Sequence, residues 1–143
     1  SAGGILATRA MVCGCAGIVT DGGLRDADEI AELAMPAFCA VRSAPTNLTR
    51  HHAVDINVPI GCGTAPVFPD DIMVGDGDGV IVLPRHLADE IALEAFNQDR
   101  LETFILGEIR NGAALRGTYP PSPETLARFK ASLGDDGTGS GAI

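Results

Sequence analysis

The chain is short of positive charge. Among its 143 residues, 10 are Lys or Arg and 19 are Asp or Glu, which gives a formal net charge of −9 at pH 7. Binding to a nucleic-acid backbone depends on clustered basic side chains, so the composition argues against a nucleic-acid partner. A small anionic ligand would instead need a local basic group.

Long apolar runs are also missing. Asp, Arg or Gly interrupts every apolar run well before the roughly 20 residues that a membrane-spanning helix needs, so we expect no membrane partner. Hydrophobic residues still make up 45% of the chain, enough to build the core of one ordinary domain. We assign residues 1–133 to that domain and expect the glycine-rich residues 134–143 to form a flexible tail.

Cysteine is sparse and poorly spaced for metal binding. Cys13 and Cys15 form a close pair, but Cys39 and Cys62 stand alone, whereas a structural zinc site needs four convergent ligands. Single cysteines within apolar stretches usually behave as small buried hydrophobic residues. We therefore expect no metal on these thiols and no disulfide framework, in keeping with a reducing, cytoplasmic location.

The spacing of apolar residues predicts alternating helices and strands. Period-3.6 patterns indicate helices and short β-branched or alternating runs indicate strands, with Gly and Asp clusters as turns. The expected helices are 4–13, 26–34, 86–111 and 124–133. The expected strands are 16–20, 37–41 and 53–60, and two more within 67–84 around a hairpin turn at 76–79; a turn is also expected at 21–23.

One local arrangement carries most of the chemical information. Gly3 and Gly4 open the first helix, and Arg25 and Asp26 follow the first strand and its turn. The first N–H groups of a helix, here near Gly4 and Ile5, have no intrahelical partner and attract anionic oxygens. Each residue also has a purely structural interpretation. The glycines would then form only a tight turn, Asp26 would be only a helix N-cap, and Arg25 would be only a surface arginine.

Other polar clusters are weaker candidates. Asp76 and Asp78 lack the further oxygen ligands and the final Glu of an EF-hand, so we interpret their segment as a hairpin turn. His51 and His52 are adjacent in an extended segment, so their side chains point to opposite faces and make a poor chelating pair. The alternative that one of them lines a site stays open.

The chain nevertheless resembles a known family. Gly4, twenty intervening residues, Arg25-Asp26, two more residues and Glu29 match the Gly-x20-Arg-Asp-x2-Glu/Asp pattern of the RraA-like proteins, which include the class II pyruvate aldolases. The stretches 43–49, 55–60, 76–80 and 117–121 extend the resemblance over nearly the whole chain.

The resemblance implies a fold and an assembly. It implies an α/β swivelling β/β/α domain with a mixed sheet flanked by helices, assembled as a homotrimer or hexamer with a site at the subunit boundary. Glu94 and Glu102 are conceivable donors of a carboxylate to a neighbouring subunit's site.

It also implies a reaction. A lyase of this family would cleave 4-hydroxy-2-oxo acids such as 4-hydroxy-4-methyl-2-oxoglutarate, or decarboxylate oxaloacetate, through a pyruvate enolate with Mg²⁺ or Mn²⁺. Arg25 and Asp26 would be the catalytic residues: Arg25 would bind the pyruvyl carboxylate, and Asp26 would hold the metal. The amides near Gly4 and Ile5 would complete the substrate-binding cradle. These residue types suit the chemistry, because arginine offers a bidentate fork to a carboxylate and a hard cation stabilises a developing oxyanion.

Two departures from the family pattern qualify this picture. Several aldolases of the family carry Asp where this chain has Gly4, which leaves the particular aldol substrate open. Family members also have a substantial segment before the glycine pair, so we expect this chain to be a C-terminal portion or to pair with a separate N-terminal fragment. The alternative function is a non-catalytic, protein-binding regulator of a ribonuclease, as some relatives are named.

Overall fold

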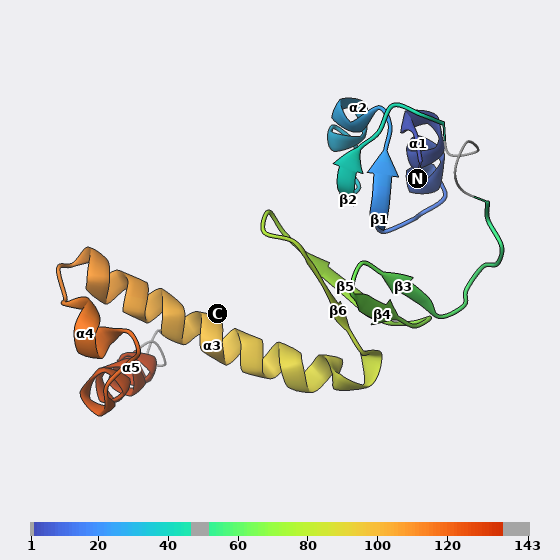
Figure 1. Ribbon diagram of the computed structural model, residues 1–143. Coiled ribbons are helices and arrows are strands. Elements are labelled where there is room, and N and C mark those ends of the chain that lie inside the picture. Colours follow the sequence, from blue (N-terminus) through green and yellow to red (C-terminus); the bar gives the residue numbers. More distant parts are fainter. Residues whose placement is uncertain (1, 47–51, 136–143) are drawn as a thin grey trace, which may run out of the picture. The chain divides into compact units, whose positions relative to one another are not determined.

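The computed structural model describes residues 2–46 and 52–135 (Figure 1). Contacts divide the chain into two compact units, Ser1–Ala88 and Asp89–Ile143, and each unit is described by itself. Within the described residues, the strands lie in the first unit, and the second unit consists of helices.

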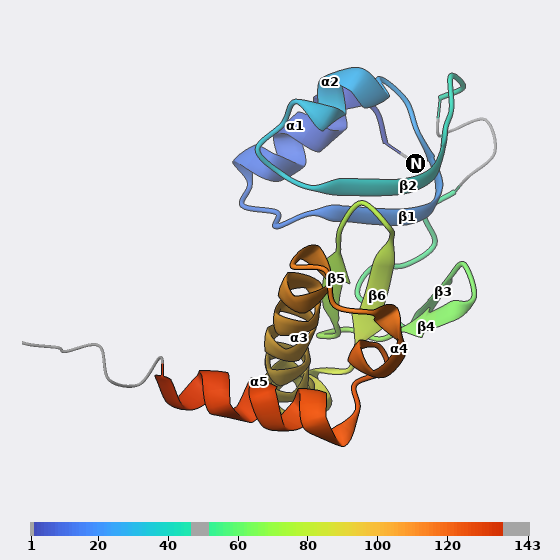
Figure 2. The same ribbon diagram turned by 90° about the vertical axis from the view of Figure 1, so that its left-hand side faces the viewer.

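The first unit is built around a parallel strand pair. Strand β1 (Ile18–Leu24) pairs with β2 (Ala37–Arg42), and helices α1 (Gly4–Val12) and α2 (Ala27–Ala31) both lie above the two strands in the view of Figure 2. Parallel strands need a crossover connection, which α2 supplies. The apolar faces of these elements meet in a small core of Ala7, Leu24, Ile30 and Met35.

Two antiparallel hairpins complete this unit. Strand β3 (Ile60–Cys62) pairs with β4 (Ala65–Val67), and β5 (Ile72–Gly75) pairs with β6 (Val80–Leu83). In the turn between β5 and β6 the carboxylate of Asp76 accepts the backbone N–H of Asp78 at 2.8 Å, which confirms the predicted hairpin. Parallel and antiparallel strands flanked by helices confirm the predicted mixed α/β class.

The second unit is helical. At the end of the first unit the 3-10 turn η2 (Arg85–Leu87) leads into the long helix α3 (Ala88–Arg110), which is followed by α4 (Leu115–Thr118) and α5 (Pro123–Asp135). Phe104 of α3 and Phe129 of α5 lie with ring centroids 5.6 Å apart. None of the helices in the described part of the chain combines the length and the apolar character that a membrane span requires.

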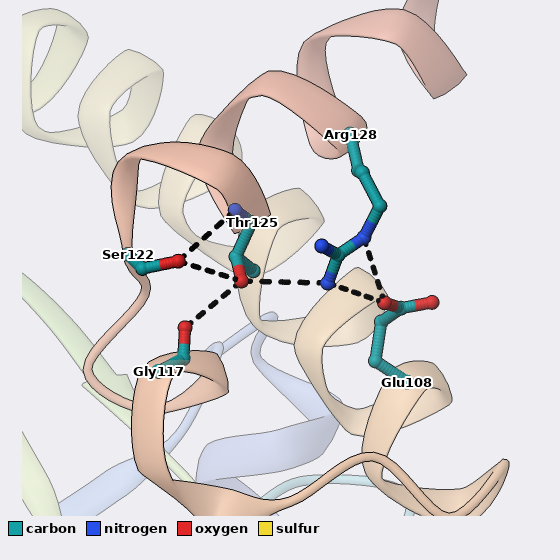
Figure 3. A network of polar contacts seen from close by, with 5 residues as sticks. All are labelled: Glu108, Gly117, Ser122, Thr125 and Arg128. Atoms are coloured by element: carbon teal, nitrogen blue, oxygen red, sulfur yellow. Dashed lines mark hydrogen bonds and ion pairs between the residues drawn. The ribbon is translucent and has the colours of Figure 1, made fainter.

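A polar network fixes α4 and α5 against α3 (Figure 3). The Thr125 side chain is 2% exposed, and its hydroxyl donates to the Gly117 carbonyl at 2.8 Å. The Arg128 guanidinium donates to the Glu108 carboxylate at 2.8 and 3.1 Å. The Gly117 carbonyl also accepts the N–H of Ser122 at 2.8 Å, so the buried Thr125 hydroxyl makes the second of two hydrogen bonds that join this carbonyl to the start of α5.

Several local predictions are wrong. Residues 53–59 form no strand, because nothing in the described ranges pairs with them, and Val54 and Ile56 are 90% and 87% exposed. The predicted turn at 21–23 lies inside β1, since Gly23 pairs with Val41 of β2. The second helix ends at Ala31 rather than at residue 34.

The cysteine and tail predictions have mixed outcomes. Cys13 and Cys15 are exposed rather than buried, because no described residue packs over the end of α1, while Cys39 and Cys62 are half-buried; all four are free thiols. Residues 134 and 135 of the predicted tail belong to α5, and residues 136–143 lie outside the described part.

Candidate active site

Asp26 stands at the junction of β1 and α2 in an unusual backbone conformation. Its φ and ψ are 57° and 40°, the left-handed region, and its side chain makes no capping bond to α2. Instead its Oδ2 accepts the N–H of Gly4 at 3.0 Å, so the carboxylate caps α1. A left-handed non-glycine residue costs on the order of 1–3 kcal/mol and is typical of functional sites.

Arg25 is held beside this carboxylate. Its Nε lies 3.5 Å from Asp26 Oδ2, and the two side chains are 40% and 36% exposed. An ion pair this exposed adds little to stability. A Cβ placed on Gly3 would lie 2.8 Å from Arg25 Nη2 and 3.0 Å from Asp26 Oδ2, so the missing side chain of Gly3 makes room for both groups.

A second carboxylate approaches the same helix start. A Cβ on Gly4 would lie 2.9 Å from Glu29 Oε2 and 3.6 Å from Asp26 Oδ2. Residues three apart share one face of a helix turn, which places Glu29 on the same side of the α2 turn as Asp26. The sequence pattern included Glu29 but gave it no role, although this spacing is the signal that brings it to the site.

Two cavities adjoin at Arg25. The first, of about 300 Å³, is lined by Gly3, Ile5, Leu6, Arg9, Arg25 and Pro45. The second, of about 440 Å³, is lined by Arg25 together with Asp26, Asp28, Glu29 and Arg42. Arg25 therefore stands between a basic, partly apolar cavity and an acidic one.

The acidic cavity suits a hard divalent cation. Among the described residues no three His, Cys, Asp or Glu side chains converge as a ready-made metal cage. Mg²⁺ typically uses only one or two carboxylates and keeps several waters, so the carboxylates of Asp26 and Glu29 fit such an ion. Asp26 uses Oδ2 for the Gly4 N–H, and the described residues give its Oδ1 no hydrogen-bond donor.

Among the described residues, the other candidates make no hydrogen bond or ion pair with the Arg25 and Asp26 side chains. Ile5 follows Gly4 in the first turn of α1, with its side chain 91% exposed. His52 is exposed and lines neither cavity, and His51 lies outside the described ranges. Glu94 and Glu102 are exposed on α3 in the second unit, and their role toward a neighbouring subunit stays a prediction.

The fold is that of an α/β protein in which an arginine and two carboxylates, Arg25, Asp26 and Glu29, gather at the glycine-lined start of α1. The family model "RraA-like: Aldolase/RraA" matches residues 1–82. The chain belongs to the RraA-like family.

Curated relatives agree with this assignment. A Halalkalibacterium halodurans protein named "Putative 4-hydroxy-4-methyl-2-oxoglutarate aldolase" is 37% identical over 95 residues, which are 66% of this chain and 44% of that protein. The "4-hydroxy-4-methyl-2-oxoglutarate aldolase" of Thermus thermophilus is 30% identical over 83 residues, 58% of this chain and 50% of that protein. The chain spans about half the length of the curated relatives it matches.

Solved structures show the same fold. An uncharacterized protein from Pseudomonas syringae superposes with a TM-score of 0.77 at 30% identity, covering 83% of this chain and 56% of that one. Streptomyces coelicolor RraAS2, described as an unusual member of the RNase ES inhibitor RraA protein family, gives a TM-score of 0.60 at 32% identity, covering 76% and 55%.

Proposed function

We propose that this protein is a divalent-metal-dependent lyase acting on 2-oxo acids, by retro-aldol cleavage of 4-hydroxy-2-oxo acids, decarboxylation of oxaloacetate, or both. The observation that carries the proposal is the fixed pair of Arg25 and Asp26 at the glycine-lined start of α1. The names of two relatives, both 4-hydroxy-4-methyl-2-oxoglutarate aldolases, support the retro-aldol part of the proposal.

Arg25 would bind the carboxylate next to the oxo group. A guanidinium offers two parallel N–H donors to a carboxylate, which fixes the orientation of the substrate as well as its affinity. Because Gly3 leaves room for it, this guanidinium lies directly against the start of α1. The positive end of the helix then adds to its attraction for an anion.

The two amides predicted for substrate binding would play different parts. The Gly4 N–H already donates to Asp26, so Gly4 contributes mainly by admitting two carboxylates close to its Cα. The Ile5 N–H is the amide left to meet a substrate oxygen. Several aldolases of the family carry Asp at the position of Gly4. In this chain the carboxylate of Glu29 approaches Gly4 and would take the place of that missing Asp side chain.

Asp26, assisted by Glu29, would hold Mg²⁺ or Mn²⁺. When bound, such an ion supplies stabilisation for the negative charge that develops on the 2-oxo oxygen as the adjacent C–C bond breaks. The hydrogen bond from Gly4 and the contact with Arg25 hold the Asp26 carboxylate in place beforehand. Such preorganisation avoids a rearrangement cost during the reaction.

The test is pyruvate release by the full protein. Oxaloacetate and 4-hydroxy-4-methyl-2-oxoglutarate would be supplied with Mg²⁺, and enzyme-free decarboxylation would be subtracted. We expect Arg25→Ala to lose at least tenfold in kcat/KM, as removal of a charge-assisted bond predicts. Arg110→Ala, an exposed arginine at the end of α3, is the matched control. Equal turnover in wild type and Arg25→Ala would contradict the proposal.

The second candidate is a protein-binding regulator of a ribonuclease. It is favoured by the RraAS2 relative, described as a member of an RNase ES inhibitor family, and by the net charge of −9, which would complement a basic protein surface. Capture of a purified RNase E-type enzyme, with no metal-dependent turnover of either 2-oxo acid, would establish this role instead of the lyase.

We also propose a cytoplasmic homotrimer or hexamer. Several large apolar side chains of the first unit are more than half exposed, including Ile5, Val12 and Val54. An assembly that covered these side chains would remove their apolar surface from water. Sedimentation of the full protein would show three or six copies, whereas a monomer would contradict the assembly.

A further inference from the structure

The basic cavity contains a second arginine that the lyase mechanism does not use. Arg9 lies one helical turn after Ile5 on α1, and both residues line the cavity of about 300 Å³ together with Arg25. Residues four apart lie on one face of a helix, which explains why both reach the same space. No acidic side chain lines this cavity.

Arg9 also has no partner of its own. It is exposed, and within residues 2–46 and 52–135 the structure gives it no ion pair and no side-chain hydrogen bond. Two guanidinium groups that line one cavity, with no carboxylate in its lining, concentrate anions there. Arg9 lies in the last turn of α1, where a cation is also favoured by the helix dipole, so the test needs a control for that effect.

We propose that Arg9 is a specificity-determining residue that binds the far carboxylate of a dicarboxylic 2-oxo acid, while Arg25 binds the carboxylate beside the oxo group. This inference rests on the proposed function and assigns a residue to its choice between substrates. Ile5, Leu6 and Pro45 supply apolar lining in the same cavity as the two cations, which suits the carbon chain of such an acid. The volume is at the small end of ligand sites, as a short diacid requires.

A monoanionic substrate engages only Arg25 and leaves Arg9 solvated. A dianionic substrate gains a charge-assisted hydrogen bond, which is among the stronger contacts available to a small ligand. Arg9 therefore controls the choice between the two classes and leaves the bond-breaking step unchanged. Its removal raises KM for the dianion and has little effect on kcat.

The experiment compares two aldol substrates in the full protein with Mg²⁺. 4-Hydroxy-2-oxoglutarate carries a far carboxylate, and 4-hydroxy-2-oxopentanoate carries a methyl group there. We expect Arg9→Gln to raise the KM for 4-hydroxy-2-oxoglutarate about tenfold. The KM for 4-hydroxy-2-oxopentanoate should change less than twofold. Arg9→Lys recovers part of the loss. Arg110→Gln, which removes the same charge from the last turn of α3, leaves the ratio at the wild-type value.

The outcomes separate the two proposals. Pyruvate release with the same substrate ratio in wild type and Arg9→Gln overturns the role of Arg9 and leaves the lyase intact. No release from either substrate by the wild type contradicts the lyase. In that case the role of Arg9 is tested by calorimetry alone, by comparing the affinity for 2-oxoglutarate, which has a far carboxylate, with the affinity for 2-oxobutyrate, which lacks one. Loss of the preference for 2-oxoglutarate in Arg9→Gln supports its role, and an unchanged preference overturns it.

Discussion

Replacing Gly3 by alanine should separate stability from activity. Gly3 has φ −115° and ψ 175°, an extended conformation that alanine adopts without strain. Gly→Ala at a compatible position raises the free energy of unfolding by about 0.4–1 kcal/mol, because the unfolded chain loses conformational freedom. The new Cβ would also lie 3.0 Å from Asp26 Oδ2, which caps α1 and must give way slightly, so the variant should be about as stable as the wild type.

Activity should nevertheless fall. The new Cβ would lie 2.8 Å from Arg25 Nη2, and ordinary van der Waals contact begins at 3.4 Å, so the guanidinium must retreat. Misplacing a substrate-positioning group by about 1 Å can cost roughly a hundredfold in rate. We expect kcat/KM for oxaloacetate to fall by between roughly tenfold and a hundredfold.

Gly77→Ala is the matched control. A Cβ at Gly77 meets no atom within 4 Å, and its φ lies outside the left-handed range. Steady-state pyruvate release and urea unfolding would be measured for both variants of the full protein. Wild-type kinetics in Gly3→Ala would refute the idea that Arg25 works from its position against the start of α1.

Three further outcomes follow from the same structure. Ile30→Ala should lower the free energy of unfolding by about 2–5 kcal/mol, because Ile30 is 2% exposed in the core under α2; a change below 1 kcal/mol in urea unfolding would contradict this packing. Thr125→Val should lower it by about 0.5–1.5 kcal/mol by removing the hydroxyl that donates to the Gly117 carbonyl, which keeps its bond from the Ser122 N–H, whereas the exposed Thr103→Val should be nearly neutral; equal effects would count against the network. Chelation with EDTA should abolish pyruvate release and added Mg²⁺ or Mn²⁺ should restore it, so turnover that survives chelation would rule out the metal.

Local chemistry explains what the sequence could predict. The predicted helix at 4–13 is α1, Gly4–Val12, and the predicted helix at 86–111 is largely α3. The hairpin turn at 76–79 was also readable, because the Asp76 side chain bonds to backbone two and three residues ahead. Each of these features depends on residues within a few positions of one another.

Features that depend on residues far apart in the chain could not be predicted from the sequence alone. Residues 53–58 alternate like a strand, but no described residue pairs with them, and an alternating pattern does not say whether a partner exists. Gly23 was predicted in a turn and is drawn into β1 by Val41. β-Propensity is known to be overridden by such context.

In the candidate site, too, local features could be predicted from the sequence and tertiary contacts could not. The spacing of Arg25 and Asp26 after a strand identified both as candidates, and the position of Asp26 before α2 suggested an ordinary N-cap. Only the tertiary fold shows that Asp26 caps α1 through Gly4, 22 residues away in sequence. The approach of Glu29 to the same glycine and the shared cavity of Arg9 and Arg25 depend on that packing as well.

The most direct measurement is a crystal structure of the full protein soaked with Mg²⁺ and oxalate, an unreactive mimic of pyruvate. The account predicts an ion against the Asp26 carboxylate and an oxalate carboxylate on the Arg25 guanidinium. An ion bound elsewhere, or an oxalate that makes no contact with Arg25, would contradict it.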